Sequence, residues 1–246
     1  MAPPPHFDAR LVAARRLTPS VRELTFERVD REALVFQPGQ WVSAFLPLAE
    51  PLKRSYSIAS PPDGSPRFEI AVTRVQDGPG SSWLHRVEGG AVVPFMGPQG
   101  FFTRPPSEGS PALMIATGTG FTPMRSMLRA AVAAGSIAPT WVLLGVRHEV
   151  DVLYADEMEA LTREHPDIRF EVTLSQPTGG PGGAWKGRRG YVQAHVRELW
   201  DAMTALGRGT PHAYVCGLER MVGSVRSLLR KEMGLPRLVV HTERYD

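Results

Sequence analysis

Cysteine is almost absent from this chain. A single residue of this type, Cys216, occurs among 246 residues. One thiol excludes an internal disulfide framework, and it also excludes an iron-sulfur cluster ligated by cysteines of this chain alone. Any such cluster that takes part in its chemistry must therefore belong to a partner.

Long apolar runs are missing as well. The longest, WVLLGV at 141–146, is far shorter than the roughly 20 residues that span a bilayer. The first residues contain no apolar stretch of signal-peptide length, so we expect a cytoplasmic protein without membrane association. The composition, 42% hydrophobic and 22% charged, is typical of a folded globular protein and excludes disorder and fibres.

Two further patterns are lacking. The seven histidines show no metal-ligand spacing such as HExxH, and no nucleophile-elbow pattern is present, so we assign no metal and no triad chemistry. The net charge of +3 is spread too evenly for a nucleic-acid-binding surface. This modest excess favours an acidic protein partner through electrostatic steering, although a solvated arginine-rich face is the simpler explanation of any single cluster.

The first half of the chain has the pattern of short strands separated by turns. Phe68, Ile70 and Val72 alternate with polar or small neighbours, and turn segments such as PPDGSP and QDGPGSS separate the strands. Alternation with period two predicts an antiparallel sheet, which we expect to close into a barrel. The expected strands lie at 11–18, 21–29, 41–47, 54–60 and 67–75.

The pattern changes near residue 111. From there apolar runs alternate with helix-like stretches, which is typical of a doubly wound α/β fold with a parallel sheet. We expect five strands and four helices, at 112–116, 141–146, 170–175, 213–217 and 237–241 and near 123–134, 151–164, 191–205 and 219–233 respectively. The segment RPPSEGSP suits a linker, so the sequence predicts two domains, 1–106 and 107–246.

A glycine-rich turn follows the first strand of the second half. It contains Gly118, Thr119 and Gly120, and it runs into Thr122 and Pro123, which we expect as N-cap and first residue of a helix. Glycines let backbone N–H groups approach a pyrophosphate, and the helix terminus adds favourable partial charge. Pro123 stands where the dinucleotide fingerprint has its third glycine, so a plain structural turn explains this motif alone equally well.

The first half contains a second candidate anion site. Arg54, Ser55, Tyr56 and Ser57 open one strand, and an arginine beside an aromatic ring and small hydroxyls can hold a phosphate together with a planar ring. The segment GPGSSWL at 78–84 can offer amide and hydroxyl donors to an anion. Taken singly, a barrel strand with a surface arginine and an ordinary turn are the simpler explanations.

Together these motifs resemble one known family. In chain order they are RSYS, GPGSSWL, FMGPQGFF, GTGFTPMRSML, LLGVRHEVDVLY, WKGRRGYV, YVCGLERM and the terminal ERY. The succession spans nearly the whole chain and resembles the ferredoxin-NADP reductase superfamily. It is most similar to bacterial stand-alone ferredoxin or flavodoxin reductases and to reductase components of oxygenases without their iron-sulfur domain. The resemblance implies an FAD-binding barrel, 1–106, and an NAD(P)-binding α/β domain, 107–246.

For the barrel, the resemblance implies FAD in preference to FMN. Arg54 would pair with the flavin pyrophosphate, Tyr56 would pack on the isoalloxazine, and Ser57 would lie near flavin N5. A guanidinium fork matches phosphate geometry, and an aromatic ring covers a flavin face without adding charge. Further cofactor contacts would come from Ser55, Gly80, Ser81 and Ser82.

For the α/β domain, the resemblance implies a coenzyme site at the carboxyl ends of two strands. Cys216 and Gly217 end the fourth strand at the edge where doubly wound folds bind ligands. Cys216 would orient the nicotinamide of NAD(P)H for hydride transfer to the flavin, without acting as a nucleophile. The pyrophosphate and nicotinamide would also contact Gly118, Thr119, Gly120 and Pro123.

The end of the chain resembles the Glu-x-aromatic ending of the family. This implies that Glu243 lies near flavin N5 and that Tyr245 covers the second flavin face. Tyr245 would then move before the nicotinamide stacks, which makes it a candidate gate. A frayed terminus with a surface tyrosine is the alternative.

Coenzyme preference depends on a few residues. NADPH-preferring relatives often carry Ser-Arg after the third strand, where this chain has Ser175 followed by Gln176. Arg188 and Arg189 can replace the missing guanidinium at a 2′-phosphate, which favours NADPH slightly over NADH. A solvated basic loop explains the two arginines equally well.

The sequence therefore predicts an FAD-dependent oxidoreductase that passes electrons between NAD(P)H and a one-electron carrier, an acidic protein such as ferredoxin or flavodoxin. Ser57, Cys216 and Glu243 are the expected catalytic residues. Two alternatives stay open. One is an NAD(P)H-dependent reductase of free flavin, ferric chelates or quinones. The other is a flavin-binding electron-transfer subunit that does not turn over NAD(P)H.

Overall fold

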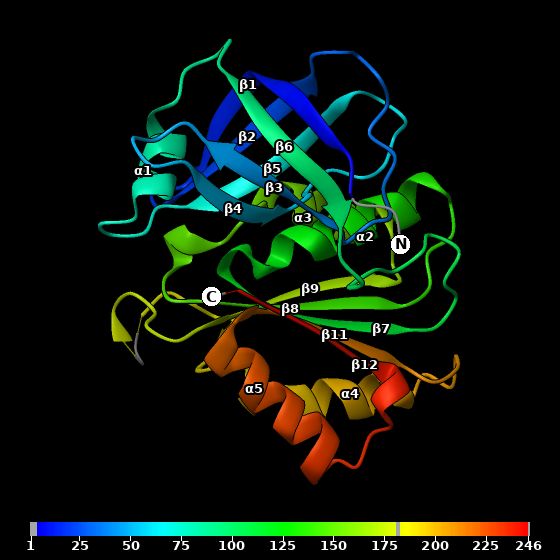
Figure 1. The fold of residues 1–246 in the computed structure, drawn as a ribbon. Coiled ribbons are helices and arrows are strands. Elements are labelled where there is room, and N and C mark those ends of the chain that lie inside the picture. Colours follow the sequence, from blue (N-terminus) through cyan, green and yellow to red (C-terminus); the bar gives the residue numbers. More distant parts are fainter. Residues whose placement is uncertain (1–3, 181–182, 246) are drawn as a thin grey trace. The chain divides into compact units, whose positions relative to one another are not determined.

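The computed structural model describes residues 4–180 and 183–245. The chain forms two compact units (Figure 1). The barrel unit contains the residues up to Pro106 together with Thr122–Ala134, and the sheet unit contains Ser107–Phe121 and the residues from Gly135 onward. Residues 122–134, assigned from the sequence to the second domain, thus belong to the barrel unit by their packing.

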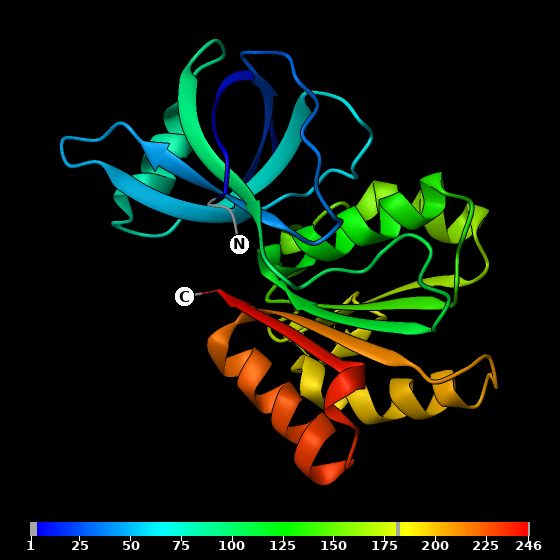
Figure 2. The same cartoon turned by 45° about the vertical axis from the view of Figure 1, so that its right-hand side comes forward.

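The barrel unit is built on six antiparallel strands, in the order β4-β3-β6-β1-β2-β5 (Figure 2). An antiparallel bridge between Ile58, just after β4, and Ile70 on β5 joins the two edges, so the predicted closed barrel is present. The strands are β1 (His6–Thr18), β2 (Val21–Arg28), β3 (Trp41–Leu46), β4 (Leu52–Ser57), β5 (Arg67–Thr73) and β6 (Val92–Gln99).

Aromatic side chains fill the interior of the barrel. The rings of Phe26, Phe68 and Phe95 are completely buried, and their centroids lie 5.0 to 5.8 Å apart. Phe7 stacks on Phe95 at 5.8 Å and closes the cluster. Because a barrel of this size is filled by its own side chains, a cofactor must bind to its outer surface.

Two elements of the barrel unit were not expected from the sequence. β6 contains Pro94, Gly97 and Pro98, which indicate a turn in a sequence pattern, yet the strand pairs with both β1 and β3. Helix α1 (Pro79–Arg86) lies where we expected only a turn. Its first residue is Pro79, a favourable start for a helix, and its Leu84 is completely buried.

The sheet unit contains a parallel sheet in the order β10-β9-β8-β7-β11-β12. The sequence predicted five strands, and the structure adds β10, whose two residues are too short to form a pattern. The strands are β7 (Ala112–Thr117), β8 (Thr140–Val146), β9 (Ile168–Leu174), β10 (Arg188–Arg189), β11 (His212–Leu218) and β12 (Val240–Tyr245). The chain leaves β7 in one direction for β8 and returns to its other side for β11, so the order reverses between β7 and β11.

The last strand lies further along the chain than predicted. The apolar residues Leu238 and Val239 fall in a 3-10 turn (Arg237–Val239), and the polar segment Val240–Tyr245 forms β12. An edge strand pairs on one side only and therefore needs no continuous apolar run. The prediction of a strand at 237–241 was thus too early by a few residues.

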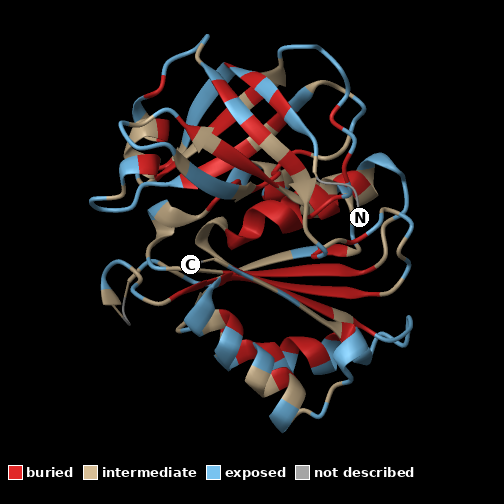
Figure 3. Ribbon diagram, in the orientation of Figure 1, coloured by how far each residue is buried: buried red, intermediate tan, exposed pale blue. Residues whose placement is uncertain are grey.

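Helices cover both faces of the parallel sheet, as a doubly wound fold requires. In Figure 1, α4 (Val196–Thr204) and α5 (Glu219–Ser227) lie on one face and α3 (Ala155–Glu164) on the other. α5 continues as a π-helical segment (Leu228–Glu232). Burial is concentrated in the central strands and on the faces of the helices that meet them (Figure 3). Among the described residues, further 3-10 segments are Gly118–Gly120, Glu149–Asp151 and Val192–Ala194.

Helix α2 (Phe121–Ala133) begins earlier than predicted. The turn Gly118–Gly120 is itself a 3-10 segment that leads directly into the helix, so Thr122 and Pro123 lie in the first helical turn instead of at the cap. Within the described residues, none of the helices has the length and apolar character needed to cross a membrane.

Candidate functional site

The RSYS segment forms the end of β4 in the barrel unit. Arg54 and Ser55 are exposed, Tyr56 is half-buried against the core, and Ser57 is 5% exposed. The hydroxyls of Ser55 and the buried Ser43 lie 3.2 Å apart across β3 and β4. β4 thus presents a cation at one point and a ring two residues further along.

The first turn of α1 packs against Arg54. A Cβ on Gly80 would lie 3.0 Å from Leu46 Cδ1, 3.1 Å from Leu52 Cδ2 and 3.6 Å from Arg54 Cγ. A Cβ here would require the two leucine side chains to shift by a few tenths of an ångström, so glycine favours the close approach of the helix to β4. The approach brings the first turn of α1 next to the side-chain stem of Arg54, whose guanidinium donates to Lys53 O at 2.9 Å. The free N–H groups of a helix N-terminus and a guanidinium are a combination suited to a phosphate.

Not every donor of this helix is available to a ligand. The Ser82 amide donates to Gly78 O at 3.0 Å. The Ser81 hydroxyl accepts from Val75 N at 3.1 Å and lies 3.1 Å from Gly78 O, to which it donates. Ser81 therefore stabilises the turn that starts α1, and the amides of Gly80 and Ser81 are the donors left for an anion.

The ring of Tyr56 stays neutral. Burial raises the pKa of Tyr56 to about 12, while the nearby Arg54 charge acts in the opposite direction. A neutral phenol can pack on a flavin ring without adding a charge.

In the sheet unit, the glycine turn lies at the point where the strand order reverses. Gly118 has a φ of +50°, which favours glycine, and a Cβ there would point into open space. A Cβ on Gly120 would lie 2.3 Å from Cys216 O, so only glycine fits beside β11. Thr119 lies between the two glycines and belongs to the same turn.

Cys216 and Gly217 occupy the carboxyl end of β11, directly beside this turn. A Cβ on Gly217 would lie 2.3 Å from the hydroxyl oxygen of Thr117, and Gly217 has a φ of +147°. That hydroxyl is buried and has no hydrogen-bond partner among the described residues. An unsatisfied donor at a switch point is the kind of group that a polar ligand would satisfy. The sequence analysis missed Thr117, although its place at the end of an apolar strand was visible.

Glu243 lies beside Cys216. The two residues are paired in the parallel register of β11 and β12, and Leu218 is paired with Tyr245. Burial raises the pKa of the Cys216 thiol, the Glu243 charge raises it further, and a hydrogen bond with the Tyr245 side chain acts in the opposite direction. The structure therefore brings together three residues that the sequence analysis selected separately.

The expected 2′-phosphate residues lie at the ends of β9 and β10. Ser175 follows β9, and its amide donates to Val146 O at 3.0 Å. Arg188 forms ion pairs with Glu171 and, through two nitrogens at 2.8 Å, with Glu198. These carboxylates raise the pKa of Arg188 and occupy its fork.

Arg189 is also engaged within the protein. Its guanidinium donates to Gly180 O at 2.7 Å and to Trp185 O at 3.0 Å, so it holds the loop that precedes β10. Arg147, which the sequence analysis did not select, is exposed after β8, and its carbonyl accepts from Gln176 N at 2.9 Å. Arg147 is thus a cation close to Ser175 and Gln176, and it forms no ion pair with the described residues.

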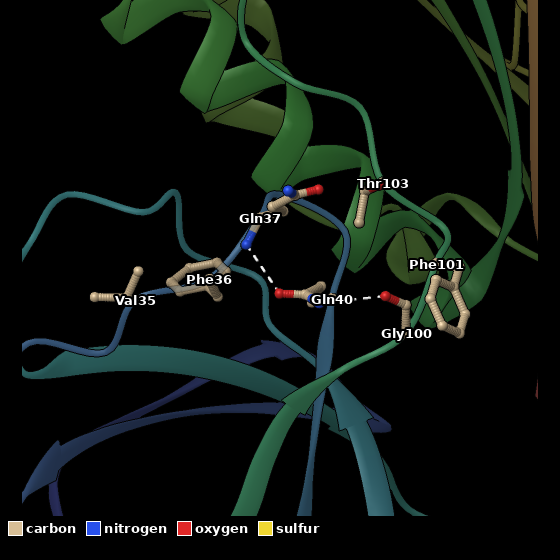
Figure 4. A pocket seen from close by; sticks show the side chains of 7 residues that line it. All are labelled: Val35, Phe36, Gln37, Gln40, Gly100, Phe101 and Thr103. Atoms are coloured by element: carbon tan, nitrogen blue, oxygen red, sulfur yellow. Dashed lines mark hydrogen bonds between the residues drawn. The ribbon is translucent and has the colours of Figure 1, made fainter. Parts of the chain in front are cut away.

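A cavity of about 400 Å³ lies in the barrel unit, and none of the residues selected above lines it (Figure 4). Gln40 connects its two sides, because its side chain accepts from Gln37 N and donates to Gly100 O. Val35 and Phe101, both largely exposed, flank it. No ionisable residue lines the cavity, so it offers no group for acid-base or redox chemistry. The described residues also contain no group of three metal-binding side chains.

Two family models match the chain. The model described as an oxidoreductase FAD-binding domain matches residues 8–103. The model described as an oxidoreductase NAD-binding domain matches residues 114–227. The first match falls on the strands of the barrel unit, and the second covers the glycine turn and Cys216.

Curated relatives match over most of the chain. Ferredoxin–NADP reductase B of Sorangium cellulosum is 57% identical over 242 residues, which cover 98% of both chains. A glycine betaine monooxygenase reductase subunit of Pseudomonas aeruginosa is 30% identical, and the match covers 90% of this chain but 59% of that protein.

Solved structures show the same fold. The ferredoxin reductase in carbazole 1,9a-dioxygenase superposes with a TM-score of 0.84 at 23% identity, over 100% of this chain and 70% of that one. A ferredoxin–NADP+ reductase from Neisseria gonorrhoeae, with bound FAD and NADP, superposes with a TM-score of 0.79 at 18% identity, over 97% and 98%.

Proposed function

Because this chain belongs to the ferredoxin–NADP reductase family of FAD- and NAD-binding oxidoreductases, we propose that it passes electrons between NADPH and a one-electron carrier protein of the ferredoxin type. The single observation that carries the proposal is the gathering of Gly120, Cys216 and Glu243 where the strand order of the parallel sheet reverses. The 57% identical ferredoxin–NADP reductase supports the choice of acceptor.

The chain is an oxidoreductase with an FAD-binding and an NAD(P)-binding domain, as the sequence predicted. Bound FAD supplies the chemistry that joins the two substrates, since it accepts a hydride and releases electrons singly. The contribution of the protein is to hold both ligands and to place charge around them.

FAD would be held on the outside of the barrel by Arg54 and the N-terminus of α1. The guanidinium and the amides of Gly80 and Ser81 lie on two elements that pack together, and they can share one pyrophosphate. The neutral ring of Tyr56 would cover one face of the isoalloxazine, with Ser57 next to its reactive edge. Ser55 would stabilise β4 through its hydroxyl contact with Ser43, and Ser81 and Ser82 would stabilise the start of α1 through their hydrogen bonds to Gly78 O.

NAD(P)H would be held at the carboxyl ends of β7 and β11. Gly118, Thr119 and Gly120 would offer backbone amides to the pyrophosphate, and Pro123 would fix the first turn of α2 behind them. The close approach of Gly120 to Cys216 fixes the end of β11 against the glycine turn, and the buried Thr117 hydroxyl beside Gly217 would be a polar contact for the ligand.

Cys216 would orient the nicotinamide as a neutral thiol. Its raised pKa excludes a thiolate near neutral pH, so the role is steric and no covalent step is involved. Glu243 would supply the ionisable group that exchanges a proton with the flavin. Tyr245 would act as a gate, since its hydrogen bond with Cys216 must break before a nicotinamide can take that position.

For the 2′-phosphate of NADPH, the occupied fork of Arg188 makes this residue a poor ligand. We therefore transfer the role expected of Arg188 to Arg147, next to Ser175 and Gln176, with Arg189 shaping the loop opposite. The name of the 57% identical relative supports NADPH over NADH.

The carrier would be an acidic protein, either ferredoxin or flavodoxin. The net charge of +3 and the pI near 9.3 favour encounter with such a partner. We also propose a cytoplasmic location, because reduced nicotinamide coenzymes are produced there.

The decisive experiment is an anaerobic titration of the purified, flavin-loaded protein with NADPH and, separately, NADH. The proposal expects stoichiometric bleaching of the flavin by NADPH. Reduced protein is then mixed with ferredoxin, flavodoxin, free FMN or a ferric chelate. Fast reoxidation by a carrier protein that weakens with added salt supports the proposal, since steered association is screened by ions. A flavin that neither coenzyme bleaches contradicts it, and salt-independent reoxidation by small acceptors alone would replace the carrier by a small substrate.

A further inference from the structure

Helix α2 carries a buried arginine that the proposed function does not use. Arg125 is 2% exposed and is surrounded on its helix by buried apolar residues, among them Met124 and Leu128. Its Nη1 donates to Glu69 Oε2 at 2.6 Å and to Ala59 O at 3.1 Å. The same nitrogen lies 3.6 Å from Glu23 Oε2, and Glu23 is 3% exposed.

The contacts of Arg125 converge on the chain segment that follows β4. Ala59 N donates to Glu69 O at 2.8 Å, and Glu69 N donates to the Ser60 hydroxyl at 3.2 Å. On the other side, the hydroxyl of the buried Ser126 donates to Ser60 O at 2.7 Å. The residues Ala59 and Ser60 are therefore clamped between β5 and α2 by hydrogen bonds to both elements.

These hydrogen bonds begin two residues beyond Ser57. They place polar groups in a buried region that apolar side chains could also fill. A buried ion pair is often no more stabilising than apolar residues of similar volume, so stability alone is a weak reason for one. What a guanidinium adds is direction, because its nitrogens fix the angles at which a carbonyl and a carboxylate approach.

We propose that Arg125 is a positioning residue for flavin reduction: with Ser126 it holds the Ala59–Ser60 segment against α2, and thereby fixes the orientation of Tyr56 and Ser57 at the end of β4. The inference rests on the proposed function, since it concerns the ring that those residues would hold. It assigns Arg125 no contact with flavin or coenzyme. Its effect is on the geometry of transfer, not on the amount of cofactor bound.

The test measures flavin reduction by NADPH in stopped flow with four flavin-loaded variants. Arg125→Met removes the guanidinium, Arg125→Lys keeps the charge without the fork, and Ser126→Ala removes one hydrogen bond with little change in volume. The matched control is Arg163→Met, which removes an exposed ion pair with Glu159 at 2.9 Å on α3. For each protein the limiting rate, the half-saturating NADPH concentration, the FAD content and the melting temperature are recorded.

We expect Arg125→Met to lower the limiting rate by about tenfold to a hundredfold, the loss that a small misplacement of reacting groups produces. FAD content and half-saturating NADPH should stay within about twofold of the wild type, because neither ligand loses a contact. Arg125→Lys should recover part of the rate and Ser126→Ala should lose a smaller part. Arg163→Met should match the wild type.

If Arg125→Met does not fold, Arg125→Lys and Ser126→Ala decide the matter through their limiting rates. Melting temperatures that fall while limiting rates stay at the wild-type value would overturn the positioning role and leave only a structural one. A wild-type flavin that NADPH does not reduce at all would instead overturn the proposed function, so the two failures are distinguishable.

Discussion

Cys216 and Glu243 occupy paired positions on neighbouring parallel strands, with the thiol completely buried and the carboxylate charge close enough to raise its pKa. Strand β12 places Glu243 there, and its polar sequence is possible because it is the edge of the sheet. The pair therefore joins a group that does not ionise near neutral pH to one that can exchange protons.

The Cys216 thiol should resist modification in the folded protein. Burial, and secondly Glu243, raises its pKa above the ordinary value, so it stays protonated where a free thiol begins to ionise. An aromatic disulfide reagent at pH 8 should label the native protein very slowly and should titrate one thiol after unfolding in urea. Fast labelling of the native protein would contradict the buried position.

The same thiol should make the protein less stable in alkali. The pKa of Cys216 is raised in the folded protein, so the stability that the protonated thiol contributes is complete below the pKa of the unfolded chain, about 8.5. That stability is lost as pH rises beyond this value and through the folded pKa. Urea unfolding midpoints between pH 7 and 10 should fall for the wild type and fall less for Cys216→Ala. Cys216→Ala should also retain FAD while its reduction by NADPH slows.

Arg54→Ala should be purified largely without flavin. The lost hydrogen bonds to a pyrophosphate are each worth about 1.5–3 kcal/mol, because both partners are charged. Arg54→Lys should keep part of the FAD, and Arg10→Ala, which removes an exposed arginine bonded to Gly90 O, should keep all of it. Absorbance at the flavin band relative to protein measures the content, and full flavin in Arg54→Ala would remove Arg54 from the site.

Gly120→Ala should disrupt the coenzyme site. The added Cβ would lie 2.3 Å from Cys216 O, which is backbone and cannot rotate away. We expect a destabilisation of about 1–3 kcal/mol and weaker NADPH binding. The control is Gly223→Ala on α5, where a Cβ meets open space; this change should stabilise the helix by about 0.5–1 kcal/mol. Thermal unfolding and NADPH titration compare the two variants. Equal stability and equal NADPH affinity would contradict the close contact between Gly120 and Cys216 O.

The ion pair of Arg188 and Glu198 should be lost in acid. A side-chain hydrogen bond from Arg188 lowers the pKa of Glu198. The stability that ionised Glu198 contributes is therefore complete above the ordinary glutamate pKa of about 4.3, and it is lost as pH falls through the lower pKa of the folded protein. Glu198→Gln should reduce the acid dependence of urea unfolding midpoints between pH 6 and 3. The NADPH to NADH preference should stay the same, and a change in it would implicate Arg188 in coenzyme choice.

The sequence predicted the features that come from a repeating pattern along the chain or from the special backbone geometry of glycine. Alternation around Phe68 predicted a barrel strand, and glycine near Thr119 predicted a turn at the end of a parallel strand. It was insufficient where tertiary contacts decide the local structure. β6 forms despite Pro94 because β1 and β3 pair with it on both sides, and two-residue β10 exists only through its pairing with Leu174 and Thr173.

The hydrogen-bond and ion-pair partners of side chains could not be predicted from the sequence either. Arg188 looked as available for a phosphate as any other basic residue of its loop, and only the fold shows that Glu171 and Glu198 already bind it. Arg125 stood between helix residues with an apolar pattern and gave no signal of its own. Its partners Glu23 and Glu69 are more than 50 residues away in the chain, so no local pattern could have joined them.

The phenylalanine-filled barrel has a consequence for how this protein can change. Residues that hold the fold, such as Phe68 and Phe95, are buried in the interior, whereas the candidate phosphate-binding residue Arg54 is exposed on β4. Substitutions that retune flavin affinity can therefore accumulate on the surface of β4 and α1 without loosening the interior. Thermostability and cofactor preference become separately adjustable properties, which makes this barrel a suitable starting point for exchanging one flavin for another.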